Sequence, residues 1–336
     1  MAELRKDVWD ISEQDFPRNG SIETQLRFLL RYAILAPSAK NSQPWRFVVE
    51  GNKVQLVAAL ERELPVADPE RRELYISLGC ALENLLVAAD QFGLQHGLMY
   101  LPDSKRPELA ASVLFAHGGT PTPARAGIPL EALLRRHNDN SVYCSEPVPE
   151  ELRERLHACC NEPDLRLDLT DDHLFRRWVD ELTLEADRLE FANPAFRKEL
   201  GYWIGQGVFG TPQLLARLSG LAISRLDLGE PVARQDHQIV ESAALLGVIS
   251  AANDSHLAHI RTGQLFERLW LTATAAGVNI HPMSQTMRSP ALRAAVGELL
   301  RTRGWIPQHL FRVGYSSRDG EPRHTPRHPL GDVLAE

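Results

Sequence analysis

Three short clusters of polar and basic residues have the composition of a ligand-binding site. The first, residues 36–47, reads APSAKNSQPWRF and places small, amide and hydroxyl side chains between an expected helix and an expected strand. The second, residues 135–141 (RRHNDNS), and the third, residues 323–329 (RHTPRHP), add guanidinium groups. Amide and hydroxyl groups suit the edge of a planar heteroaromatic ring, and arginine suits a phosphate. The alternative interpretations are an ordinary loop, a solvated helix end and a basic tail.

A glycine-rich segment, Gly205–Gly210 (GQGVFG), matches the GxGxxG pattern of a dinucleotide-binding turn. Such a turn needs a hydrophobic strand before it and a continuing helix after it. No such strand precedes this segment, and Thr211-Pro212 follows it. We therefore expect a flexible loop, and a nicotinamide-dependent dehydrogenase built on this segment is the least favoured function.

The histidines and cysteines do not indicate metal chemistry. His256 and His259, and likewise His324 and His328, have no neighbouring carboxylate or cysteine at the spacing of a metal site. The four cysteines form no CxxC pair and are expected to be reduced thiols. The sequence predicts no metal site.

Length and charge limit the possible classes of function. The 336 residues, 43% of them hydrophobic and 24% charged, are enough for about two domains of a globular protein. With 37 Lys and Arg against 44 Asp and Glu, the net charge of −7 argues against nucleic-acid binding. Because no apolar stretch approaches about 20 residues and the first residues do not form a signal peptide, we expect a cytoplasmic protein without a membrane partner.

The hydrophobic pattern predicts a mixture of helices and strands, an α+β fold. Strands are expected at residues 47–49, 54–57, 98–101, 113–116, 165–169 and 310–313. Helices are expected after Ser21, from Asp68-Pro69 to Gly93, and near 148–160, 172–190, 236–252, 263–277 and 290–302. The apolar run Ala243 to Ala252 is interpreted as part of a buried helix.

Segments of the first half resemble segments of the second half in the same order. Residues 79–93 align with 263–277, residues 107–111 with 290–294, and residues 114–118 with 310–314. An ordered series of this kind indicates a duplicated unit. We predict one repeat at 1–130 and a second at 131–336, packed as a pseudo-dimer around a ligand. Additional sequence in the second repeat, at about 190–235, is predicted to form a lid.

Several of these segments together resemble the nitroreductase-like FMN flavoprotein superfamily, over residues 21–335. NSQPWRF at 41–47 matches the family's NxQPWxF turn, and RHNDN at 136–140 is similar to its phosphate segment. GVNIHPMSQ at 277–285 resembles the turn beside the flavin ring, and Gly314-Tyr315 with Arg327-His-Pro329 resembles its C-terminal strand and Arg-x-Pro. The order of the segments resembles the fused two-repeat, Acg-like subfamily. The resemblance implies a nitroreductase-like fold duplicated in one chain, with antiparallel-rich sheets flanked by helices and a lid insertion in the second repeat.

The resemblance also implies which residues hold FMN. The phosphate and ribityl end would be bound by Arg136, His137, Asn138, Asn140 and Arg327, the other half would contribute Pro37, Ser38 and Asn41, and Ser284 and Gln285 would approach the ring. Asn140 and Thr325 stand where the family commonly has a basic residue, so phosphate binding would depend on Arg136 and Arg327. No catalytic side chain is predicted, because the chemistry belongs to the cofactor.

By the same resemblance, the activity is that of an FMN-dependent oxidoreductase that reduces nitro or quinone-like acceptors with NAD(P)H. The alternative is a non-catalytic protein that stores or sequesters FMN beneath a closed lid. FMN, NAD(P)H and a small aromatic acceptor are then the expected partners. The chain is expected to be a pseudo-dimeric monomer or a weak homodimer.

Overall fold

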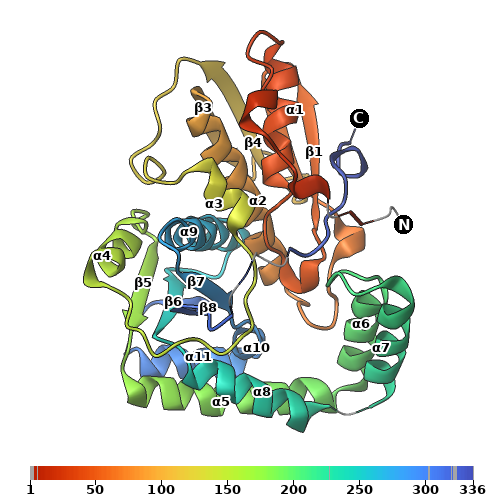
Figure 1. Ribbon diagram of the computed structural model, residues 1–336, viewed down its shortest axis with the longest axis vertical. Helices are drawn as coiled ribbons and strands as arrows, with labels where there is room; N and C mark the ends of the chain where they lie inside the picture. The colour runs from red at the N-terminus through yellow and green to blue at the C-terminus, as the bar shows by residue number, and fades with distance from the viewer. Residues whose placement is uncertain are drawn as a thin grey trace.

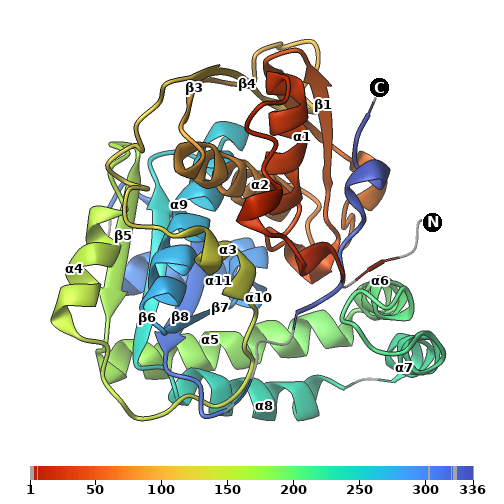
Figure 2. The same cartoon turned by 45° about the horizontal axis from the view of Figure 1, so that its top comes forward.

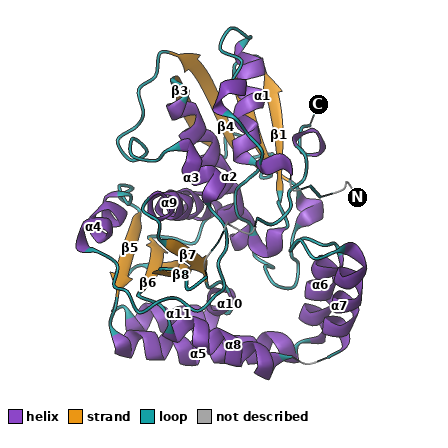
Figure 3. Cartoon of the chain, in the orientation of Figure 1, coloured by secondary structure: helices purple, strands orange, loops and turns teal. Residues whose placement is uncertain are grey.

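Two four-stranded sheets and a set of helices make up the chain (Figure 1, Figure 3). The computed structural model describes residues 4–5, 7–226, 228–301, 303–318, 320 and 324–335. Arg323, in the third polar cluster, lies outside these residues. Every pair of neighbouring strands in the two sheets is antiparallel, so the fold is α+β, as expected.

The first sheet has the strand order β1-β2-β4-β3. Its strands are β1 (Trp45–Glu50), β2 (Lys53–Ala58), β3 (Leu94–Tyr100) and β4 (Leu109–His117). β1 and β2 form the expected hairpin, with Gly51 at φ +58° in its turn. Helix α2 (Arg72–Gln91) connects β2 to β3, and α1 (Ile22–Ala33) packs against it. The hydroxyl of Ser21 accepts a hydrogen bond from the Thr24 N–H and caps α1, as the sequence predicts.

The second sheet repeats this order as β5-β6-β8-β7. Its strands are β5 (Leu165–Thr170), β6 (Leu245–Ala251), β7 (Asn279–Pro282) and β8 (Ile306–Gly314). Helix α9 (His256–Ala275) connects β6 to β7, as α2 connects β2 to β3. The shorter helices are α3 (Leu130–Arg135), α4 (Glu150–Ala158), α10 (Gln285–Arg288) and α11 (Pro290–Leu299). Within the described segments, every helix is too short or too polar to span a lipid bilayer.

Helices α2 and α9 cross so closely that only glycine fits at the crossing. A Cβ atom added to Gly79 would lie 2.0 Å from the carbonyl oxygen of Ile260, and one added to Gly263 would lie 1.9 Å from that of Ile76. The two glycines therefore make the same contact in opposite directions, as equivalent residues do across a two-fold axis. The sequence alignment of 79–93 with 263–277 pairs these same glycines.

Four helices occupy the insertion between β5 and β6: α5 (His173–Ala192), α6 (Pro194–Gly205), α7 (Gln213–Arg225) and α8 (Gly229–Glu241). Helices α5 and α8 pack together beside the second sheet, whereas α6 and α7 form a hairpin that reaches the first half (Figure 1, Figure 2). Phe196 and Trp203 of α6 share a buried cluster with Leu64 and Ala67 of the first half. The insertion therefore bridges the two halves of the chain.

The glycine-rich segment Gly205–Gly210 lies at the turn between α6 and α7. A helix precedes it where a dinucleotide-binding turn needs a strand, so it lacks the setting of that motif. The segment is anchored at one residue, because Val208 is only 2% exposed and packs in the cluster with Trp203.

The C-terminal segment leaves the second sheet and returns to the first, where it runs beside β1 (Figure 2). The N–H of Phe47 in β1 donates to the carbonyl of Val333, and the N–H of Ala335 donates to the carbonyl of Phe47, both at 2.8 Å. This return carries Arg327 past the end of α1, next to the carbonyl groups of Leu35 and Ala36.

Three sequence-based predictions of local structure are wrong. The apolar run predicted as a helix contains strand β6, whose residues are all buried; a short strand buried on both faces has no alternating pattern to distinguish it from a helix. Helix α2 begins at Arg72 instead of Pro69, although the Asp68 carboxylate still accepts a hydrogen bond from the Leu74 N–H at 2.8 Å. Residues 107–111 enter strand β4 whereas 290–294 lie in α11, so their alignment does not relate equivalent structures.

Candidate functional site

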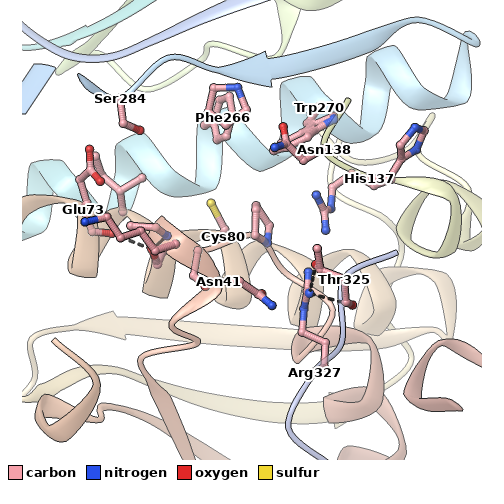
Figure 4. Close-up of a pocket in the computed structure, with 18 of the residues that line it drawn as sticks. Asn41, Glu73, Cys80, His137, Asn138, Phe266, Trp270, Ser284, Thr325 and Arg327 are labelled. Carbon is pink, nitrogen blue, oxygen red and sulfur yellow. Dashed lines mark hydrogen bonds between the residues drawn. The ribbon is translucent and has the colours of Figure 1, made fainter. Parts of the chain in front are cut away.

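A cavity of about 940 Å³, counted with its open mouth, lies between α2 and α9 (Figure 4). Its walls come from the loop after α1, the facing sides of α2 and α9, the segment after α3, the turn before α10 and the C-terminal segment. Residues of both halves therefore meet around one space.

Two buried arginines that are distant in sequence converge at one end of this cavity. Arg136 is 2% exposed, donates from Nη2 to the carbonyl of Leu35 at 2.9 Å, and lies with its guanidinium 4.6 Å from the ring centroid of Trp270. Arg327 is also 2% exposed and donates from Nη2 to the carbonyls of Leu35 at 3.0 Å and Ala36 at 3.1 Å. Because both guanidinium groups bind the carbonyl of Leu35, they lie side by side.

The neighbouring acid does not balance the charge of this arginine pair. The fully buried Glu267 of α9 places Oε1 3.3 Å from Nε of Arg136. Burial, together with repulsion from Arg136, lowers the pKa of Arg327 well below its usual value, and burial lowers the pKa of Arg136. Arginine nevertheless stays protonated in proteins. Two buried cations beside one buried acid make a site that favours a further anion.

Apolar and aromatic side chains line the middle of the cavity. Phe266 and Trp270 project into it from α9 (Figure 4), and Ile76 lies on the α2 side. The ring of His309 in β8 lies 4.1 Å from that of Phe266, between centroids. Burial lowers the pKa of His309 to about 3, so its ring is neutral at physiological pH. An aromatic, largely uncharged lining of this kind suits a planar ring system.

The loop after α1 adopts a strained backbone conformation at the cavity wall. Lys40, Asn41 and Gln43 have φ values of 50°, 52° and 51°, in the left-handed region that is costly for residues with a side chain. The side-chain amide of Asn41 donates to the carbonyl of Val208 in the insertion at 2.7 Å and to that of Pro326 at 2.9 Å. Contacts with the insertion and with the C-terminal segment therefore hold this loop in place.

Eight of the ten residues predicted to bind the cofactor line the cavity: Pro37, Ser38, Asn41, Arg136, His137, Asn138, Ser284 and Arg327. The other two lie outside the lining. Asn140 is exposed, because the Asp139 carboxylate accepts a hydrogen bond from the Ser141 N–H in a turn that follows Asn138. The amide of Gln285 donates to the Asp236 carboxylate of α8 at 2.8 Å.

Sequence reasoning missed several residues that line the cavity. Trp9 lies in a short 3-10 turn before α1, donates from its indole N–H to the carbonyl of Thr325 at 3.0 Å, and stacks on His324 with ring centroids 3.9 Å apart. No motif in the N-terminal sequence marks it. Phe266 and Trp270 belong to a helix that is buried on most faces, so their spacing does not distinguish a cavity wall from ordinary core.

Comparison with known proteins identifies relatives that align along nearly the whole chain, although no protein-family model matches it. The chain is 28% identical over 327 residues to "Putative NAD(P)H nitroreductase Rv3131" of Mycobacterium tuberculosis, covering 92% of this chain and 90% of the relative. It is 25% identical over 318 residues to "Putative NAD(P)H nitroreductase acg" of the same organism, covering 92% and 95%. It is 22% identical over 346 residues to "Probable NAD(P)H nitroreductase PigM" of a Serratia species, covering 94% of each chain.

Solved structures with a lower overall likeness include the FMN- and NADPH-dependent nitroreductase NfnB of a Sphingopyxis strain. It is 15% identical, with a TM-score of 0.42, and the match covers 61% of this chain and 97% of that one. The NADPH:FMN oxidoreductase of Vibrio harveyi is 13% identical, with a TM-score of 0.41, covering 62% and 76%. Because both TM-scores are below 0.5, these two structures add no weight to the assignment.

The fold is α+β, with two sheets of equal strand order and a candidate ligand cavity between α2 and α9. The full-length relatives confirm the resemblance that the motifs predict: along nearly its whole length, the chain is similar to proteins that are named putative or probable NAD(P)H nitroreductases.

Proposed function

We propose that the chain binds FMN in this cavity and acts as an oxidoreductase of the nitroreductase type, reducing a nitro or quinone-like acceptor with NAD(P)H. The observation that supports this most is the pair of buried arginines, Arg136 and Arg327, at one end of an aromatic-lined cavity. FMN has the matching distribution of charge, with a phosphate at one end and a planar ring system at the other. The names of the relatives support the same activity.

The residues of the chain would bind and orient the cofactor. Arg136 and Arg327 would hold the phosphate with charge-assisted hydrogen bonds, and Asn138 lies on the same side of the cavity (Figure 4). Phe266 and Trp270 would pack against the apolar part of the ligand. Bound FMN would supply the electron and hydride transfer that the protein side chains lack.

We also propose that residues 1–130 and 131–336 are two repeats of one ancestral unit, packed as a pseudo-dimer with a single FMN site. The equal strand orders of the two sheets and the reciprocal contact of Gly79 and Gly263 support this proposal. A second phosphate site at the corresponding place is disfavoured, because Arg268, with Arg125, is committed to the buried carboxylate of Glu83.

The alternative is a protein that sequesters FMN, and the contacts of the insertion favour it. Phe209 lines the cavity, and the Glu199 carboxylate of α6 binds Lys40 at 3.4 Å and the backbone N–H groups of Val66 and Ala67 at 2.8 and 3.1 Å. These contacts fasten the insertion to the loop at the cavity wall. A lid held in this way would exclude a bulky reductant such as a nicotinamide dinucleotide.

The two functions differ in how bound flavin responds to reductants. Purified protein loaded with FMN is mixed anaerobically with NADPH, and the visible absorption of the flavin is followed. An oxidoreductase predicts that the flavin bands bleach with NADPH and return when a nitroaromatic or quinone is added. Bands that persist with NADPH and bleach only with dithionite would contradict the oxidoreductase and support sequestration.

Removal of the Glu199 carboxylate is expected to speed the exchange of FMN. In Glu199→Ala, Lys40 and the N–H groups of Val66 and Ala67 lose their shared acceptor, so we expect release to be about tenfold faster, the equivalent of losing one charge-assisted hydrogen bond. Stopped-flow displacement of FMN measures the rate. Glu230→Ala is the matched control, because Glu230 lies in the same insertion but is exposed. Equal release rates for the two variants would show that Glu199 does not hold the lid.

A further inference from the structure

Glu267 is the acid beside the arginine pair, and it has far fewer hydrogen bonds there than its counterpart in α2, Glu83. It is fully buried in the middle of α9, with Oε1 3.3 Å from Nε of Arg136. Within the described residues, neither carboxylate oxygen of Glu267 has a well-aligned hydrogen bond, and the same holds for the Nε atoms of Arg136 and Arg327. Burial raises the pKa of Glu267 to about 7.

Glu83 provides a comparison within the same molecule, since it lies 184 residues earlier at the corresponding position of α2. Its Oε1 accepts hydrogen bonds from Nε of Arg125 at 2.7 Å and Nε of Arg268 at 2.9 Å, and its Oε2 accepts one from Nη2 of Arg125 at 2.9 Å. Although burial opposes ionisation, these guanidinium groups lower the pKa of Glu83 to about 2. The acid of α2 is therefore ionised at neutral pH and held by several hydrogen bonds from two arginines, whereas the acid of α9 has a single ion pair, with Arg136.

The groups that act on Glu267 come from three parts of the chain around α9: Arg136 from the end of α3, Arg327 from the C-terminal segment, and Cys80, Glu83 and Asn84 from α2. The arginines and the amide favour the charged form of Glu267, whereas burial and the charge of Glu83 favour the neutral form. Burial raises the pKa of the Cys80 thiol well above its usual value, so that thiol stays protonated. Glu267 is thus the group of this cluster that can change its charge near neutral pH.

We propose that Glu267 is a built-in counter-charge that sets the strength of phosphate binding by taking up one proton when the phosphate of FMN binds Arg136 and Arg327. Without ligand, its carboxylate neutralises part of the arginine charge. A phosphate dianion brought to the same buried arginines is repelled by an ionised Glu267 and not by a protonated one. The proton comes from the solvent, so above pH 7 each bound FMN consumes close to one proton. This inference rests on the proposed function, because it takes FMN as the source of the phosphate.

A definite pH dependence follows from this arrangement. Below pH 7, Glu267 already carries its proton in the free protein, and the phosphate meets two unopposed cations. Above that pH, each binding event must import a proton, so the affinity falls as pH rises, by up to about tenfold per pH unit. Between pH 7 and 8 the expected loss is about fivefold. The phosphate of FMN does not cause this loss, because its second pKa is about 6 and it is already dianionic there.

The test compares FMN with riboflavin, which has the same ring and no phosphate. Flavin-free protein and Glu267→Gln are titrated with each ligand between pH 7 and 8, with binding followed by quenching of flavin fluorescence. For the unmodified protein, we expect the fivefold loss of affinity with FMN. With riboflavin we expect less than a twofold change, because riboflavin has no phosphate that an ionised Glu267 would repel. For Glu267→Gln, we expect FMN binding at pH 8 to be at least about fivefold tighter than for the unmodified protein and independent of pH.

Proton uptake is measured separately on the unmodified protein, by calorimetry of FMN binding at pH 8 in two buffers of different ionisation enthalpy. We expect close to one proton per FMN, and this result stands even if Glu267→Gln fails to fold. No proton uptake, or the same pH dependence in the Glu267→Gln variant, would overturn the proposal. Equal weakening of FMN and riboflavin binding in that variant would also overturn it and make Glu267 a structural residue. A folded protein that binds neither ligand would instead refute the proposed function, and the inference with it.

Discussion

Replacement of Arg327 by alanine is expected to weaken FMN binding by about a hundredfold, or about 2.8 kcal/mol, the value of a hydrogen-bonded charge at a buried site. Arg327 is 2% exposed, and its guanidinium lies beside that of Arg136 on the carbonyl of Leu35. Without it, a bound phosphate would meet a single guanidinium, that of Arg136.

Riboflavin separates the role of Arg327 in phosphate binding from its role in the fold. Because riboflavin has no phosphate, Arg327→Ala should change its affinity by less than about threefold. Arg46→Ala serves as the matched control, since Arg46 is half-exposed and paired with Glu61 at the surface. Circular dichroism verifies that each variant is folded. Equal losses for FMN and riboflavin would mean that Arg327 supports the cavity wall and does not bind the phosphate.

Alanine at Gly79 should destabilise the protein by about 3 kcal/mol or more, because overpacking at a rigid helix crossing forces backbone to move. The new Cβ atom would lie 2.0 Å from the carbonyl oxygen of Ile260 and 2.9 Å from Cα of Gly263. Gly263→Ala places its Cβ 1.9 Å from the carbonyl of Ile76 and should cost a similar amount. Urea denaturation followed by tryptophan fluorescence measures both losses.

Gly127→Ala is the control for this pair of variants. A Cβ atom at Gly127 meets nothing within 4 Å, so the stability should change by no more than about 0.5 kcal/mol. Since Gly79 and Gly263 touch, the double variant should lose a different amount from the sum of the single losses. A Gly79→Ala protein as stable as the Gly127→Ala control would show that α2 and α9 do not cross this closely in solution.

Local signals predict the parts of the fold that depend on neighbouring residues in the chain. The hydroxyl cap of Ser21 and the hairpin of β1 and β2 are correct, because a cap and a tight turn are formed within a few residues. The strand β6 is mistaken for a helix because burial on both faces is a property of the whole fold. The contact of Gly79 with Gly263 is visible in the sequence only as a repeat, since spacing alone does not reveal two helices that touch.

In the candidate site too, residues in local motifs could be predicted from the sequence, and residues brought together only by the fold could not. Arg136 and Arg327 could be predicted because each lies in a short motif that resembles the family pattern. Glu267 could not, because it is one acid in a buried helix, and its lack of compensation depends on which arginines surround it in space. Trp9 reaches the cavity only through the return of the C-terminal segment, with the carbonyl of Thr325 as its partner.

Titration of the flavin-free protein with FMN, followed by visible absorption, tests the central claim most directly. Binding at the arginine pair between α2 and α9 predicts a protein-bound flavin spectrum that saturates at one FMN per chain. A folded protein that shows no bound flavin, or one that binds two FMN per chain with equal affinity, would contradict the assignment of a single FMN site to this cavity.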